Sequence, residues 1–104
     1  MKQFDGIIAL DAMGGDFGPA ITVPAAITAI KDFGIKVILV GNPDEINVEL
    51  SKFPKEISEK MKVIPSEGIV EEGESPVSAY RNKPNASIFV SAGLVKKGYA
   101  NGVV

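Results

Sequence analysis

Asp11-Ala12-Met13-Gly14-Gly15-Asp16-Phe17-Gly18-Pro19 is the stretch that decides the fold, because it joins an apolar run to a helical pattern. The run before it, residues 6–10 (GIIAL), predicts a short buried strand, and residues 20–33 carry apolar side chains at helical spacing. Glycine-rich turns between a strand and a helix are where α/β proteins bind ligands. Paired glycines let backbone N–H groups approach an anion, and the helix dipole favours negative charge there.

A β-α-β unit follows from the residues that come next. Gly34 suits the left-handed end of a helix, and residues 35–40 form a nearly continuous apolar strand. Such a crossover is right-handed, so the two strands should be parallel. After this unit the sequence pattern predicts a helix over 44–53, a loop or short helical turn over 55–60, and a strand over 61–65. An exposed loop is expected over 66–74. Two helices should follow, one from Ser75-Pro76 to near Pro84 and one over 86–97, and a strand should start at 102–104.

This alternation predicts an α/β fold with three layers, α/β/α, and a mainly parallel sheet, an incomplete Rossmann-like N-terminal portion. We interpret residues 1–104 as the N-terminal part of a single larger α/β domain. A parallel sheet needs both faces covered, and so short a chain has few helices with which to cover them. Without further chain or a partner, we therefore expect an underfilled face or edge and self-association through exposed apolar surface.

Composition excludes several classes of function. The chain has 104 residues, is 45% hydrophobic and 23% charged, and carries a formal net charge of -2. Its lysines alternate with carboxylates and form no basic stripe, which argues against a nucleic-acid partner. No signal sequence or membrane-spanning stretch is present in the sequence, so we expect a cytoplasmic protein. Cysteine and histidine are both missing, which excludes a thiolate nucleophile and a serine-histidine-acid triad.

Two interpretations of the glycine-rich stretch remain open. Gly14 and Gly15 either bind phosphate through their backbone or simply allow the positive φ of a tight turn. Neither the dinucleotide fingerprint nor the P-loop lysine is present. Asp11 and Asp16 would repel a phosphate unless a positive group compensates them. They either shape the loop, with Asp11 accepting from backbone N–H groups and Asp16 capping the helix near Pro19, or one of them orients phosphate or a metal.

Four further side chains are candidates for an anion site. The Thr22 hydroxyl lies one turn into the first helix, where it could reach a ligand or merely pack. Ser75 is either a helix cap or a more distant phosphate contact, and no adjacent base would activate it as a nucleophile. Arg81 and Lys83 are the nearest cations for an acidic ligand, and both are equally consistent with ordinary solvated side chains.

The order of residues resembles the phosphate acyltransferases of bacterial phospholipid synthesis (the PlsX family), which open with a strand and the same Asp-Ala-Met-Gly-Gly-Asp-x-Gly-Pro loop. The resemblance covers essentially the whole chain. Besides the loop it rests on Val23-Pro24-Ala25, Ile38-Leu39-Val40-Gly41, Glu74-Ser75-Pro76 and Leu94-Val95-Lys96-Lys97-Gly98.

The resemblance implies transfer of a fatty acyl group from acyl carrier protein to inorganic phosphate; we expect no cofactor, and we assign no metal ligand. It carries Gly14, Gly15 and Asp16 onto the phosphate end of the site, with Asp11 as a loop organiser and Ser75 as a more distant contact. Together with the residues themselves, this gives Asp16 and Asp11 as catalytic candidates and Gly14, Gly15, Thr22 and Ser75 as phosphate-binding candidates. It also implies a cytoplasmic homodimer, with possible peripheral contact to the membrane through other regions.

Members of that family are roughly three times as long, so the chain is interpreted as an N-terminal fragment. The family's Ser-Ala-Gly-Asn-Thr-Gly segment would be expected after Val104, and Ser91-Ala92-Gly93-Leu94 is a different motif within a predicted helix. We therefore expect the isolated chain to lack acyltransferase activity. Two alternatives stay open: a stand-alone module that binds a small anion or nucleotide, and a structural or interaction role with an empty loop.

Overall fold

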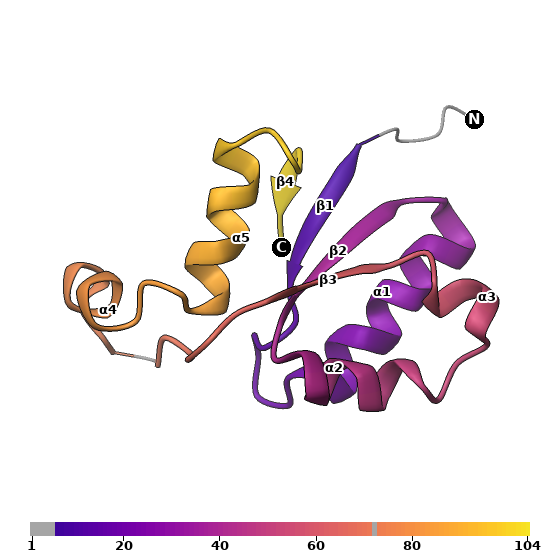
Figure 1. Cartoon of the computed structure of the whole chain (residues 1–104), viewed down its shortest axis with the longest axis horizontal. Helices are drawn as coiled ribbons and strands as arrows, with labels where there is room; N and C mark the ends of the chain where they lie inside the picture. Colours follow the sequence, from indigo (N-terminus) through magenta and orange to yellow (C-terminus); the bar gives the residue numbers. More distant parts are fainter. Residues whose placement is uncertain (1–5, 72) are drawn as a thin grey trace.

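Four parallel strands form the sheet of the computed structural model, which describes residues 6–71 and 73–104 (Figure 1). In spatial order the strands are β3 (Lys62–Pro65), β2 (Lys36–Gly41), β1 (Ile7–Asp11) and β4 (Gly102–Val103). The predicted α/β class is confirmed, and every strand pair is parallel. The prediction that the first two strands are parallel is confirmed as well, and the two strands are neighbours, with Ile8 paired to Val37 and Leu10 to Leu39.

The helices lie on both sides of this sheet. Helix α1 (Pro19–Phe33) packs on one face together with α2 (Pro43–Leu50) and α3 (Lys55–Ser58), whereas α5 (Ser87–Lys96) packs on the other (Figure 1). Helix α4 (Pro76–Asn82) extends away from the sheet and contacts α5 through the rings of Tyr80 and Phe89, which meet edge to face at 5.1 Å. The three-layer arrangement is therefore present in the described residues.

Strand alternation explains where the core lies. Val37 and Leu39 point toward α1 and α2 and form one core with helix residues such as Val23 and Ile46. Val40 and Ala9 are also fully buried, but they point to the opposite face, where α5 lies. A strand buried on both faces reads as a continuous apolar run, which is why the sequence of β2 is so uniform.

Most element boundaries agree with the sequence prediction, and one helix is shorter than expected. Gly34 ends α1 with a φ of 66°, as predicted. Helix α2 ends at Leu50 and not at Phe53, because residues 51–53 continue as a turn in which the Phe53 N–H donates to the Leu50 carbonyl at 3.1 Å. Pro54 accounts for this, since the residue before a proline avoids helical geometry. Residues 55–60 contain a short helical turn, which decides between the two alternatives.

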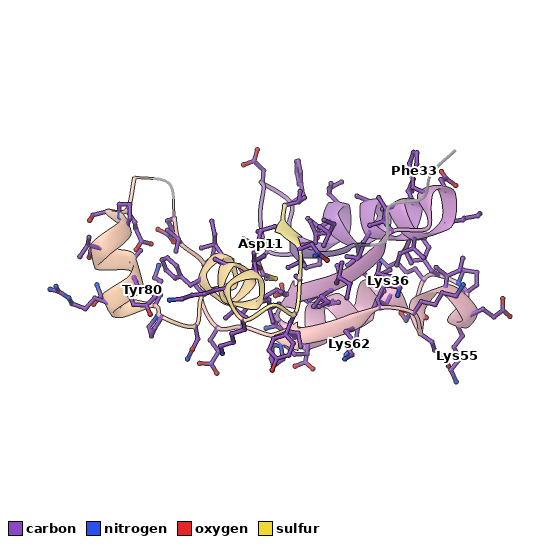
Figure 2. The ribbon with its side chains drawn as sticks, turned by 90° about the horizontal axis from the view of Figure 1, so that it is seen from above. Asp11, Phe33, Lys36, Lys55, Lys62 and Tyr80 are labelled. Atoms are coloured by element: carbon purple, nitrogen blue, oxygen red, sulfur yellow. The ribbon has the colours of Figure 1, made fainter. Side chains whose placement is uncertain are left out.

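A hollow of about 930 Å³ lies beside the amino ends of the strands. Ile7, Ile38 and Ile64 of the strands line it, together with Leu94 and Tyr99 from the α5 side and Ile30 and Ile35 from the α1 side. Lys36 and Lys62, which begin β2 and β3, also line this hollow (Figure 2). Self-association through exposed apolar surface stays a prediction. Within residues 6–71 and 73–104, none of the helices has the length and apolar character needed to cross a membrane.

Candidate functional site

The strand order creates a crevice beside the glycine-rich loop. After β1 the chain builds β2 and β3 on one side of that strand, and it then returns to add β4 on the other side. The carboxyl ends of β1 and β4 are therefore a topological switch point, the place where open α/β sheets bind ligands. The loop between β1 and α1, residues 12–18, lies at this end.

A cavity of about 350 Å³ occupies the crevice. It brings together five of the six predicted site residues, which are Asp11, Gly14, Gly15, Asp16 and Thr22. Ser75 does not line it. The other lining residues are apolar and come from the strands, the loop and two helices: Leu10, Phe17, Ile21, Ile88, Val103 and Val104.

Asp11 organises the first half of the loop, as predicted. Its Oδ1 accepts a hydrogen bond from the Met13 N–H at 3.0 Å, and its carbonyl accepts from the Gly14 N–H at 3.1 Å. The Ala12 N–H donates to the Val40 carbonyl at 2.9 Å and so ties the loop to β2. The turn itself uses the Gly14 N–H as a donor, and phosphate binding by Gly14 stays a prediction.

The second half of the loop keeps its donors. In the described part of the chain, the N–H groups of Gly15, Asp16, Phe17 and Gly18 have no hydrogen-bond partner. Gly15 has a φ of 75° and Gly18 a φ of 57°, the left-handed region that favours glycine. The unpartnered donors of the loop therefore begin at Gly15, the second glycine of the pair.

Asp16 does not cap helix α1, contrary to one of our two interpretations. Gly18 holds the N-cap position, and no side chain accepts a hydrogen bond there. Its backbone, with a φ of 57° and a ψ of -138°, is accessible to glycine but not to a residue with a side chain. Asp16 consequently lies within the loop, where its carboxylate lines the cavity.

Thr22 locks the loop onto helix α1. Its hydroxyl lies 2.7 Å from the Ala12 carbonyl and 3.2 Å from the Gly18 carbonyl, and it donates to these oxygens. A hydroxyl has one proton, so the Thr22 side chain has only its lone pairs left for a ligand. The structure therefore gives Thr22 a positioning contact between the two ends of the loop.

Gly41 is a residue that the sequence analysis did not single out as part of the site. A Cβ on Gly41 would lie 2.8 Å from Met13 Sδ and 3.0 Å from Ile46 Cδ1. The glycine thus lets the Met13 side chain of the loop pack against the carboxyl end of β2. The available signal was its position directly after the apolar strand predicted over 35–40, because a glycine at the end of a strand permits close approach of another segment.

Ser75, Arg81 and Lys83 lie in the segment that carries α4. Ser75 is the N-cap of α4, where its Oγ accepts from the Ser78 N–H at 3.4 Å, so the capping alternative is confirmed. Lys83 Nζ donates to Glu74 Oε1 at 2.6 Å and to the Ile69 carbonyl at 2.9 Å. These contacts connect Ile69 and Glu74 to the end of α4, and they occupy Lys83 away from the cavity.

The Lys83–Glu74 contact predicts a pH dependence for this loop. The hydrogen bond from Lys83 holds the pKa of the Glu74 carboxyl below its ordinary value of 4.5, with a further contribution from the Glu71 N–H. A carboxyl with a lowered pKa stabilises the folded loop above its unfolded pKa, and this contribution is lost as the pH falls through the folded value. We expect the protection factor of the Glu71 amide, which donates to Glu74 Oε1 at 2.9 Å, to decrease once the pH falls below that range.

The same hydrogen bond raises the pKa of Lys83 above 10.5, so at the alkaline end the contact is lost only as the pH rises through that raised value. Glu74→Gln should remove the acid transition, measured as hydrogen exchange at Glu71, and Glu67→Gln in the same loop should retain it. An unchanged acid transition in Glu74→Gln would contradict the assignment.

The cavity combines two carboxylates with backbone donors and lacks a cation among its lining residues. Across residues 6–71 and 73–104, the acidic side chains form no cluster of three or more that could hold a metal ion. The chemistry that this crevice offers is hydrogen bonding from neutral amides to an anion, beside an apolar wall.

A family model matches residues 7–104, and its description is "Fatty acid synthesis protein".

The chain is also similar to curated proteins named phosphate acyltransferase. It is 42% identical over 98 residues to the one from Nitratidesulfovibrio vulgaris strain DP4, a match that covers 94% of this chain and 28% of that protein. The match to the Lawsonia intracellularis protein is 41% over 97 residues and covers 93% of this chain and 28% of that protein. The Vibrio campbellii protein is 41% identical over 98 residues, which is 93% of this chain and 29% of that protein. The chain thus spans less than a third of the length of these relatives.

Proposed function

Because the chain belongs to the fatty acid synthesis protein family, we propose that it supplies the phosphate end of an acyltransferase site. The reaction is transfer of a fatty acyl group from acyl carrier protein to inorganic phosphate, which gives an acyl phosphate for phospholipid synthesis. The observation that carries this proposal is the run of four unpartnered N–H groups over residues 15–18, at the switch point and directly before α1. The name of the relatives, phosphate acyltransferase, supports it.

The chemistry needs no nucleophile from the protein. A phosphate oxygen attacks the thioester carbonyl carbon, the new C–O bond forms, the C–S bond breaks, and the carrier thiolate leaves and takes up a proton. The protein contributes by holding phosphate in line with the carbonyl and by stabilising the negative charge that develops on the carbonyl oxygen. Backbone N–H groups perform both tasks without histidine or cysteine.

Charge limits what this chain does alone. Asp11 and Asp16 line the cavity, and no lysine or arginine in the described residues lines it with them. A phosphate held there is repelled by both carboxylates unless a positive group from elsewhere compensates them. We therefore propose that residues 1–104 bind phosphate, and that the complete acyl transfer reaction takes place in the longer proteins of this family.

Phosphate binding is testable on the loop itself. We expect inorganic phosphate to shift the amide resonances of Gly15, Asp16, Phe17 and Gly18 in a ¹H–¹⁵N titration. Gly15→Ala should reduce the affinity at least tenfold, because a Cβ disfavours the φ of 75° that aims the loop amides. Gly98→Ala is the matched control, since Gly98 has a φ of 84° and, like Gly15, open space around its Cβ position.

The control separates a local effect from a general loss of stability. Both variants carry the same kind of backbone strain, so both should be slightly destabilised, and only Gly15→Ala should lose phosphate. Equal loss in both variants, or no phosphate-dependent shift in the unsubstituted chain, would overturn the proposal. Tighter binding of a nucleotide than of phosphate would favour the alternative of a stand-alone nucleotide-binding module.

Two further proposals rest on the resemblance. Residues 1–104 form part of a larger α/β domain, and the whole protein is a cytoplasmic homodimer. Contact with the membrane is proposed through regions outside this chain, and acyl carrier protein is proposed as the protein partner.

A further inference from the structure

Apolar side chains surround the loop amides and are exposed to water. Phe17 is 74% exposed, Ile21 59% and Ile88 48%. They come from the loop, from α1 and from α5, and all line the same cavity as Gly15 and Asp16. An exposed apolar cluster assembled from three separate segments around a polar site is typical of ligand recognition.

The position of these side chains relative to the amides limits what they can contact. Phe17 lies in the chain between Asp16 and Gly18, whose N–H groups have no partner in the described residues, and it lines the same cavity as Asp16. Ile21 lies in the first turn of α1, with its own N–H bonded to the Gly18 carbonyl at 3.1 Å. Ile88 lies in the first turn of α5 and reaches the cavity from the other face of the sheet.

We propose that Ile21 and Ile88, together with Phe17, form a wall that binds the first methylene groups of an alkyl chain attached to the bound phosphate. The inference rests on the proposed function, and it adds the residues that determine chain specificity. A ligand with an anionic head and a linear apolar tail satisfies both halves of the cavity, whereas inorganic phosphate satisfies only the amides.

The size of the cavity limits how many methylene groups of the alkyl chain it can bury. At about 350 Å³ it lies near the lower limit of ligand sites, which range over roughly 300–1,000 Å³. It therefore has room for a phosphate and a short part of an alkyl chain, and the rest of a long alkyl chain would lie outside the cavity. Affinity should rise by about fourfold for each methylene group that is buried and then level off within a few carbons.

The test is a titration of the 104-residue chain with inorganic phosphate and with methyl, butyl, hexyl and octyl phosphate. The readout is the ratio of alkyl phosphate affinity to phosphate affinity, measured from the loop amide resonances. We expect the ratio to rise with chain length up to a plateau. Ile21→Gln and Ile88→Gln should each lower the octyl phosphate ratio about fivefold or more, and both positions are exposed enough to tolerate the change.

Phe33→Gln is the control for the loss of an exposed apolar side chain. Phe33 is 60% exposed on the same helix as Ile21, but it lies at the far end, well away from Asp11 (Figure 2). It should leave every ratio unchanged. If phosphate itself fails to bind, the proposed function fails. If phosphate binds but the ratio is independent of chain length, or if the isoleucine variants leave it unchanged, the wall is not the chain-binding surface and this inference alone falls.

Discussion

Replacing Ile46 by alanine is expected to lower the free energy of unfolding by about 2–5 kcal/mol, the largest effect of any single change considered for this chain. Ile46 is fully buried in α2, and it belongs to the core that joins α1, α2 and the sheet. Its Cδ1 also lies at the position where Met13 and Gly41 meet, so the cavity left by alanine would open beside the loop. The measurement is urea unfolding followed by circular dichroism.

Val48→Ala is the matched control for this prediction. Val48 is also β-branched and lies on the same helix, but it is 60% exposed. Its replacement should change the stability by less than about 0.5 kcal/mol. Since alanine is the better helix former at both positions, any difference between the variants reports packing and not helix propensity. Similar midpoints for the two variants would show that α2 is not docked on the sheet as described.

Thr22→Val is expected to cost about 1–3 kcal/mol and to loosen the loop, although the two side chains have nearly the same shape. The substitution removes the hydroxyl that donates to the Ala12 and Gly18 carbonyls, and Ala12 is fully buried. A buried carbonyl without its donor carries the full desolvation penalty. The loop amides of Met13 and Gly14 should exchange faster with solvent, and phosphate affinity should fall by on the order of tenfold.

Thr28→Val provides the comparison on the same helix, because Thr28 is exposed and its hydroxyl forms no hydrogen bond within the described residues. It should leave loop exchange and phosphate binding unchanged. If the Met13 and Gly14 amides exchange at the same rate in Thr22→Val as in Thr28→Val, the two hydrogen bonds do not hold the loop. The loop geometry must then be maintained by Asp11 and the glycines alone.

Local rules predicted the elements of this fold well. The apolar run before the loop, Gly34 after the first helix and Ser75 before Pro76 each determine structure within a few residues, and all three behave as expected. The parallel pairing of the first two strands also followed, because a short crossover allows few alternatives.

Properties that depend on distant contacts could not be predicted in the same way. Nothing local to residues 102–104 indicates that they pair with β1 and not with β3, although this choice creates the switch point. The close approach of Met13 to Gly41 depends equally on two segments that are far apart in the sequence.

The lining of the cavity was predicted in outline, and the hydrogen bonds of the loop were not. The sequence identifies the loop and names Asp16 within it and Asp11 and Thr22 on either side of it, and these residues do meet in one cavity. It does not show which amides remain free, because that depends on the turn made by Asp11 and Gly14. It also does not show that Gly18, with its unusual backbone, takes the cap position in place of Asp16.

The position of β1 has a consequence for the order in which the protein folds. β1 is made first, yet one of its edges pairs only with β4, and the Ile7 N–H donates to Asn101 Oδ1 across a separation of 94 residues. During synthesis β1, α1 and β2 can associate early through local contacts, while the β4 edge of β1 stays unpaired until residues 101–103 have been made. The crevice that carries the candidate site lies on that edge, so we expect it to form after the β1-α1-β2 unit.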